Sequence, residues 1–176
     1  MLFRSDTVAL IKTAQDHAAP LRIVEAVAAV NDARKRAMAR KVAAALGGEL
    51  RGKTVAVLGL TFKPNTDDMR EAPSLVIVEQ LLQEGVRLQV HDPVAMHEAK
   101  NRLGPTVTYF ENNYEALKGA DALLVVTEWN EFRRPDFERM RTLMKAPVIF
   151  DGRNIYDPPR IRDVGFTYYG IGRGGA

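Results

Sequence analysis

Short apolar segments alternate with helix-like segments along most of the chain, and this alternation constrains the fold more than any other feature. Helices are expected at 73–84, 96–103 and 137–144, and a helical turn is expected at 114–117. Strands that are joined through helices form parallel sheets with right-handed crossovers. We therefore predict an α/β fold with a Rossmann-like, doubly wound parallel sheet. Its strands are expected at 54–59, 86–90, 106–109, 122–126, 148–150 and 166–169.

A long helix is expected ahead of this sheet. Pro20 can open a helix, and Gly47-Gly48 is a strong signal for its end. Apolar residues recur at helical spacing between Ile23 and Leu46, and a shorter helix is expected at 5–17. Such a helix joins domains or pairs with a second copy, and the alternative is that it lies along its own domain. The predicted organisation is a helical dimerisation segment (1–47), an α/β domain (48–171) and a disordered tail (172–176).

Composition and charge exclude several classes of function. The chain has no cysteine, which excludes disulfides, thiolate metal sites and cysteine nucleophiles within it, and its three histidines are too scattered for a metal site. It has no membrane-length apolar run and no signal-peptide core, so we expect a cytoplasmic protein. The net charge of +3 is spread along the chain, apart from basic groups at 34–36 and 40–41. This pattern favours a small anionic ligand over nucleic acid or a membrane.

The loop at 59–71 is the first candidate site, because ligands bind beyond the carboxyl ends of the strands in an open parallel sheet. It is long for a βα connection, and it carries Lys63 and Arg70, which suit phosphate. A dinucleotide fingerprint needs several glycines, and only Gly59 is present, so side chains must do the binding. The alternative is a solvated loop in which Lys63 pairs with Asp67 or Asp68.

Three later strand ends also carry candidate residues. Asp92 could hold a ribose or simply begin an Asp-Pro turn. Trp129 could cover a ligand or cap the core. Arg153 lies in a turn beside a glycine and could bind phosphate or form a salt bridge with Asp151 or Asp157. No catalytic constellation is evident, so these residues indicate a binding domain.

Several motifs together carry a family resemblance. The segment VAVLGLTFKPNTDDMRE at 55–71 closely resembles the signature that opens the UDP-binding domain of UDP-glucose 6-dehydrogenases. Thr127-Glu128-Trp129 and Asp151-Gly152-Arg153-Asn154 match later signatures in the right order. Segments 10–14 and 31–36 resemble the middle helices of the family. The resemblance covers residues 3–172. The sequence from Phe62 to Arg70 is more similar to that of the UDP-glucose branch than to that of the related GDP-mannose dehydrogenases.

The resemblance implies a parent enzyme with an NAD-binding domain, a dimerising central helix and a UDP-binding domain. That enzyme oxidises UDP-glucose to UDP-glucuronate in two hydride transfers, through a thiohemiacetal and a thioester on a cysteine. Against the family motif around that cysteine, Phe3 and Asp6 match, Leu2 stands at the cysteine position and Ser5 at the lysine position. The chain therefore resembles a C-terminal part that lacks the NAD domain and the nucleophile.

Site roles follow from the same resemblance. Phe3, Phe62, Lys63 and Arg153 are expected to contact UDP-glucose or UDP. Arg70 is expected to reach NAD, and Asp6 to assist water or proton transfer near the thioester.

We expect the isolated chain to form a homodimer through the helix at 20–46. We also expect it to be inactive as an NAD-dependent dehydrogenase, because thiohemiacetal formation needs a thiolate. The alternative is a non-catalytic paralogue that dimerises with a full-length dehydrogenase and regulates it. The missing glycines argue against a free-standing NAD-binding module.

Overall fold

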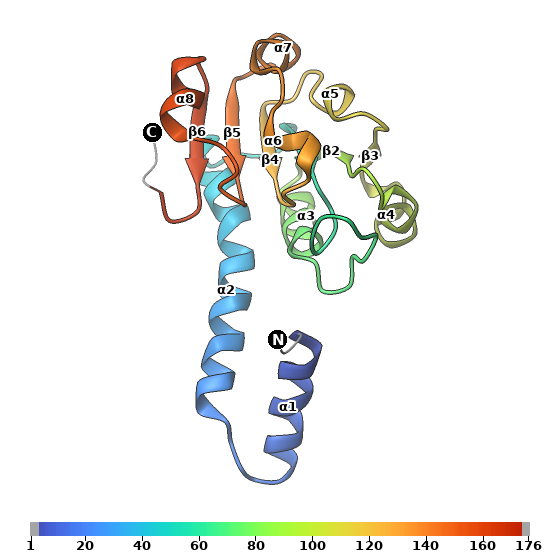
Figure 1. Cartoon of the computed structure of the whole chain (residues 1–176), viewed down its shortest axis with the longest axis vertical. Coiled ribbons are helices and arrows are strands. Elements are labelled where there is room, and N and C mark those ends of the chain that lie inside the picture. Colours follow the sequence, from blue (N-terminus) through green and yellow to red (C-terminus); the bar gives the residue numbers. More distant parts are fainter. Residues whose placement is uncertain (1–3, 174–176) are drawn as a thin grey trace.

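The computed structural model describes residues 4–173 and contains the predicted doubly wound sheet (Figure 1). All strand pairs are parallel, and the strand order is β3-β2-β1-β4-β5-β6. The predicted fold class is therefore confirmed. The strands are β1 (Thr54–Leu58), β2 (Arg87–His91), β3 (Thr108–Tyr109), β4 (Ala122–Val125), β5 (Val148–Asp151) and β6 (Thr167–Gly170).

Helices flank the sheet and precede it. Six of them, together with a short 3₁₀ turn at Gly104–Thr106, lie between or after the strands, and two precede β1. The short helices α6 and α8 were not predicted. Pro158 occupies the first position of α8, where a missing N–H is tolerated. The helices are α1 (Arg4–Asp16), α2 (Arg22–Ala45), α3 (Pro73–Gln83), α4 (Met96–Leu103), α5 (Asn113–Ala116), α6 (Asn130–Arg133), α7 (Phe137–Leu143) and α8 (Pro158–Asp163).

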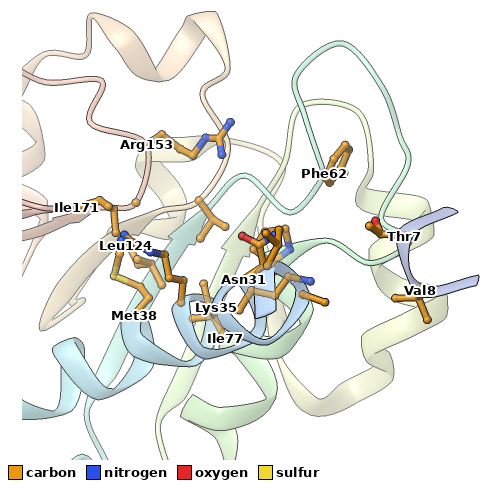
Figure 2. A pocket seen from close by; sticks show the side chains of 16 residues that line it. Thr7, Val8, Asn31, Lys35, Met38, Phe62, Ile77, Leu124, Arg153 and Ile171 are labelled. Carbon is orange, nitrogen blue, oxygen red and sulfur yellow. The ribbon is translucent and has the colours of Figure 1, made fainter. Parts of the chain in front are cut away.

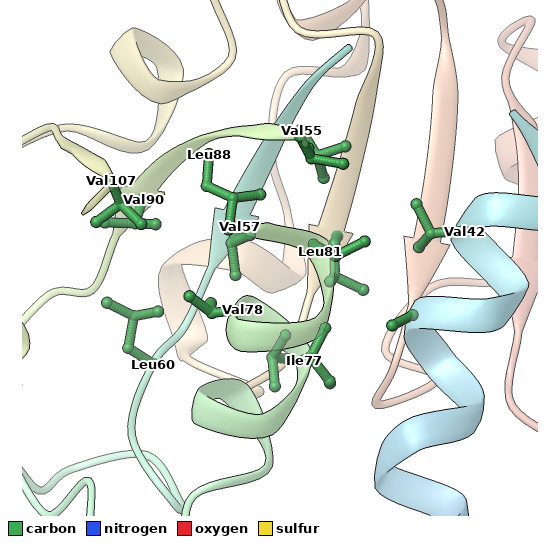
Figure 3. Close-up of a cluster of buried hydrophobic side chains, with 14 of the residues drawn as sticks. Val42, Val55, Val57, Leu60, Ile77, Val78, Leu81, Leu88, Val90 and Val107 are labelled. Atoms are coloured by element: carbon green, nitrogen blue, oxygen red, sulfur yellow. The ribbon is translucent and has the colours of Figure 1, made fainter. Parts of the chain in front are cut away.

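The core lies on both faces of the sheet, because successive strand residues point to opposite sides. On one face Val55 and Val57 pack with Val78 and Leu81 of α3 and with Val42 of α2 (Figure 3). On the other face a second apolar cluster includes residues of β4, β5, α7 and α8. Every residue of β4 is buried, as expected for a strand that is covered on both sides.

The helix α2 divides into two halves. Its C-terminal half buries Met38, Ala39 and Val42 against the sheet, whereas Ile23 and Val30 in the N-terminal half are exposed. At 1.5 Å per residue α2 is about 36 Å long. Its N-terminal half extends away from the sheet with α1 beside it (Figure 1). The interpretation that the helix lies along its own domain therefore holds only for the C-terminal half.

The loops after β1 and β4 touch at the point where the strand order reverses, which is where ligands bind in such sheets. Gly59 has a φ of +87°, and a Cβ there would lie 2.6 Å from both the backbone N and the Cβ of Thr127. The Thr127 hydroxyl donates to the carbonyl oxygen of Thr61 at 2.7 Å. This close approach fixes the start of the loop at 59–71. None of the helices within residues 4–173 has the length and apolar character of a membrane span.

Candidate functional site

A cleft of about 590 Å³ opens at the carboxyl edge of the sheet (Figure 2). Its floor includes Leu124 and Val126, at the end of β4. One face of α2 forms a wall, the first turns of α1 approach one end, and Phe62 and Arg153 lie on different sides of the opening. The cleft therefore combines an apolar floor with charged and aromatic groups at its rim.

The α2 wall contributes two cations that the sequence analysis did not place at the site. Asn31, Arg34, Lys35 and Met38 line the cleft at helical spacing. The ammonium group of Lys35 donates to the carbonyl oxygen of Glu71 at 3.1 Å, which ties α2 to the end of the 59–71 loop. The signal that would have found this wall is the register of the basic residues with Met38, the first buried residue of α2.

The turn after β5 holds the backbone of Arg153 in place. The buried carboxylate of Asp151 accepts the backbone N–H of Arg153 at 3.0 Å and the phenol of Tyr168 at 3.0 Å. Burial and the nearby Asp151 carboxylate raise the pKa of Tyr168, so the phenol stays protonated as the donor. A Cβ at Gly152 would lie 2.7 Å from the carbonyl oxygen of Val125, so only glycine fits this turn.

The side chain of Arg153 pairs with Glu128, and not with Asp151 or Asp157 as the salt-bridge alternative proposed. Its Nη2 donates to Oε1 of Glu128 at 2.7 Å, and its Nε donates to Oε2. This bidentate contact lowers the pKa of Glu128 below its ordinary value. Arg153 lines the cleft while it makes this contact, so one side chain joins the loops after β4 and β5 at the site.

Phe62 and Lys63 occupy different positions. Phe62 is 44% exposed and lines the cleft. Lys63 is exposed and is not among the residues that line the cleft, and within 4–173 it makes no hydrogen bond or ion pair. Asp68, one of its two expected partners, binds Arg70 instead.

Arg70 lies outside the cleft, in a polar hollow with Asp68, Glu98 and Arg102. Its Nε and Nη2 donate to the two carboxylate oxygens of Asp68 at 3.0 and 2.9 Å. The side-chain hydrogen bond from Arg70 lowers the pKa of Asp68 to about 2. Asp6 is exposed in the first turn of α1, next to Thr7, which lines the cleft. Phe3 lies outside the described residues.

Asp92 stabilises the fold and does not face the cleft. It is fully buried, and its Oδ2 accepts the backbone N–H of Leu60 at 2.7 Å and the indole N–H of Trp129 at 3.1 Å. Its Oδ1 accepts the backbone N–H groups of Val94 and Ala95, which confirms the turn interpretation. Because both oxygens are used, Asp92 has no capacity for a ribose. Trp129 is only 6% exposed and caps the core.

The described residues do not fit a dinucleotide cradle. The backbone N–H groups of Leu60 and Thr61, which would face a pyrophosphate in a dinucleotide fold, both donate to Asp92. Leu60 is fully buried in the core. Among residues 4–173 no three His, Asp or Glu side chains gather in a way that could hold a metal ion. Any charged ligand in the cleft must therefore be held by side chains.

The chain is similar in sequence to known proteins of one family. Residues 56–158 match the model of the UDP-glucose/GDP-mannose dehydrogenase family, UDP binding domain. The chain is 52% identical over 171 residues to a UDP-glucose 6-dehydrogenase of Rhizobium meliloti and 45% identical over 176 residues to one of Pseudomonas aeruginosa. In both cases the match covers 97% of this chain and 39% of the relative, so the chain spans about two fifths of their length.

A solved structure shows the same arrangement. The UDP-glucose dehydrogenase of the archaeon Pyrobaculum islandicum superposes with a TM-score of 0.82 at 34% identity, over 96% of this chain and 36% of that protein. The match extends beyond the α/β domain, because 96% coverage requires the preceding helices as well. With its parallel sheet, its strand-end cleft and these relatives, the chain belongs to the UDP-glucose/GDP-mannose dehydrogenase family and contains the family's UDP-binding domain.

Proposed function

We propose that this chain is the substrate-binding part of a UDP-glucose 6-dehydrogenase, whose parent reaction oxidises UDP-glucose to UDP-glucuronate with NAD. The observation that carries the proposal is the gathering of Arg34, Lys35, Arg153 and Phe62 around one cleft at the carboxyl edge of the sheet. The two relatives at 52% and 45% identity, both named UDP-glucose 6-dehydrogenase, support the UDP-glucose branch.

The proposed binding mode follows from the chemistry of the cleft. Guanidinium and ammonium groups donate charge-assisted hydrogen bonds to a diphosphate, and an arginine can do so with two parallel bonds. The ring of Phe62 would pack against the uracil or the sugar, and the apolar floor at Leu124 and Val126 would limit access of water. Phe3 and Lys63 would contact parts of UDP-glucose that extend beyond this lining.

The other family roles remain proposals of the same kind. NAD supplies the hydride acceptor in the parent reaction, and this chain offers no backbone cradle for it. Arg70 would reach NAD from the rim only after leaving Asp68, with which it forms its present ion pair. Asp6 would assist proton transfer near the thioester. A protein made of these residues would bind the nucleotide sugar without oxidising it.

We also propose that the chain has three segments with different roles: a dimerisation segment at 1–47, the UDP-sugar-binding domain at 48–171 and a tail at 172–176. Ile23, Val27 and Val30 form an exposed apolar stripe on α2, spaced by four and three residues. An exposed stripe of this kind on a helix that extends away from its domain suits a second copy of the chain.

Calorimetric titration with UDP tests the proposed function. Arg153→Ala should weaken UDP binding about tenfold or more, as expected for a lost charge-assisted contact. Arg162→Ala is the matched control, because Arg162 is exposed at the end of α8, next to the amino end of β6 and far from the carboxyl edge. The absence of UDP binding, or equal losses in both variants, would count against the cleft. Tighter binding of GDP than of UDP would move the chain to the GDP-mannose branch.

A further inference from the structure

We propose that Glu128 is a positioning residue for Arg153: it holds the edge of the guanidinium group formed by Nε and Nη2 and turns the adjacent edge, formed by Nη1 and Nη2, toward the phosphates of the ligand. The proposal depends on the proposed function, because the role of Glu128 is to prepare Arg153 for a diphosphate. It assigns a task to a residue that would otherwise be only the partner in a surface salt bridge.

The geometry of the guanidinium group carries the argument. An arginine side chain has five N–H donors in one plane. Glu128 takes one hydrogen of Nε and one of Nη2. Both hydrogens of Nη1 and the second hydrogen of Nη2 remain, and they form a second edge that can bind a phosphate bidentately. Within 4–173 no other group bonds the Arg153 side chain, which lines the cleft in this pose (Figure 2).

The two residues next to Glu128 in the chain, Thr127 and Trp129, are held in place by hydrogen bonds. The Thr127 hydroxyl bonds the carbonyl oxygen of Thr61, and the Trp129 indole bonds the buried carboxylate of Asp92. Both neighbours are buried, whereas Glu128 is only partly buried and reaches out from between them. The backbone of Glu128 is therefore held at a fixed position relative to the ends of β1 and β4, and its carboxylate reaches from there to Arg153 on the loop after β5.

Ordering in advance favours binding. A free arginine side chain loses rotamer entropy when it is fixed, and an arginine already held by Glu128 avoids part of that loss when the ligand arrives. The carboxylate also repels the ligand phosphates. The positioning effect outweighs this repulsion, because the guanidinium group of Arg153 stands between the Glu128 carboxylate and the cleft and its positive charge offsets the negative charge of the carboxylate.

A double-mutant cycle with UDP tests this role. Glu128→Ala should weaken UDP binding about five- to tenfold, which corresponds to the loss of part of the side-chain preorganisation. Glu128→Gln should lose less, because its amide oxygen still accepts one hydrogen bond from Arg153. In an Arg153→Ala background, Glu128→Ala should not weaken UDP binding any further. Binding of uridine, which has no phosphate, should be the same in wild-type protein and Glu128→Ala.

Each outcome is decisive. UDP affinity that is unchanged or higher in Glu128→Ala would overturn the proposal, because the carboxylate would then be inert or a competitor. A loss that persists in the Arg153→Ala background, or that also affects uridine, would show a structural role of the loop and would equally overturn it. If wild-type protein bound no UDP, the proposed function itself would fail. If Arg153→Ala weakened binding and Glu128→Ala did not, only the positioning role would fail.

Discussion

The indole N–H of Trp129 donates to Oδ2 of Asp92 across 3.1 Å and so joins the ends of β4 and β2, which are not neighbours in the sheet. The strand between them, β1, is drawn into the same contact, because Oδ2 also accepts the backbone N–H of Leu60. One buried carboxylate therefore sets the relative positions of three strand ends, two of which, those of β1 and β4, lead into the cleft.

Replacement of Asp92 by asparagine should lower the free energy of unfolding by about 3 kcal/mol, because an amide turns an NH₂ group toward one of the two sets of N–H donors. Urea unfolding followed by the fluorescence of Trp129, the single tryptophan, measures the change. Asp67→Asn is the control, since Asp67 is exposed on the loop, and it should change stability by less than about 0.5 kcal/mol. Equal effects of the two substitutions would show that the Asp92 contacts contribute little.

Gly59→Ala should destabilise the fold by about 3 kcal/mol or more, because it combines a left-handed backbone with a clash against the backbone of Thr127. Gly48→Ala separates the two effects. Gly48 has a similar φ of +83°, but no atom lies within 4 Å of its added Cβ, so about 1 kcal/mol is expected. Thermal unfolding of both variants gives the difference, and similar losses would mean that the loops after β1 and β4 separate easily.

The ion pair of Asp68 with Arg70 predicts an unusual titration. Because the folded pKa of Asp68 is depressed to about 2, the contribution of the pair to stability is complete above the ordinary pKa of 3.8 and is lost as the pH falls through about 2. At about pH 3 the Asp68 carboxylate should therefore remain mostly ionised, as its ¹³C chemical shift would report. In Arg70→Ala the titration should move up toward the ordinary value. A wild-type titration near pH 4 would show that the pair does not form in solution.

Ile23→Glu combined with Val30→Glu should convert a dimer into a monomer, because charges on two of the three residues of the stripe would have to be buried without partners. Sedimentation velocity measures the change in mass. Ala29→Glu is the matched control, because Ala29 is exposed on another face of the same helix. A monomeric wild-type protein, or dissociation by the control as well, would contradict the proposed dimerisation segment.

Purified protein should produce no NADH when UDP-glucose and NAD are added. The chain has no cysteine to form the thiohemiacetal, and its first strand-to-helix loop cannot cradle a dinucleotide because Asp92 already takes the N–H groups of Leu60 and Thr61. Absorbance of NADH over time is the measurement, with a full-length dehydrogenase as the positive control. Sustained turnover by the pure chain would overturn this expectation.

The fold was predictable because local patterns agreed with the tertiary structure. The apolar run of β4 indicated a strand covered on both faces, and the alternation of elements indicated a parallel sheet. The strand-end rule selected Arg153, and the family resemblance selected both Arg153 and Phe62, and both residues line the cleft. The same rule also selected Lys63 and Arg70, which lie outside the cleft lining.

The remaining features depend on contacts between distant segments. Glu128 and Arg153 are 25 positions apart, and nothing in the local sequence favours this pair over Asp151 or Asp157. Arg34 and Lys35 reached the cleft only because α2 packs its C-terminal half on the sheet. The short helices α6 and α8 have too few residues to show a helical period.

The division of α2 links the two processes proposed for this chain. Met38 and Val42 anchor its C-terminal half in the core, Ile23 and Val30 lie in the half that extends away from the sheet with α1 beside it, and Arg34 and Lys35 are between them. A stiff rod that is held at its base converts a slight tilt into a larger displacement at its tip. If a ligand in the cleft changes that tilt, it alters the surface offered to a second copy. By thermodynamic reciprocity, association at the tip then changes the affinity of the cleft by the same factor.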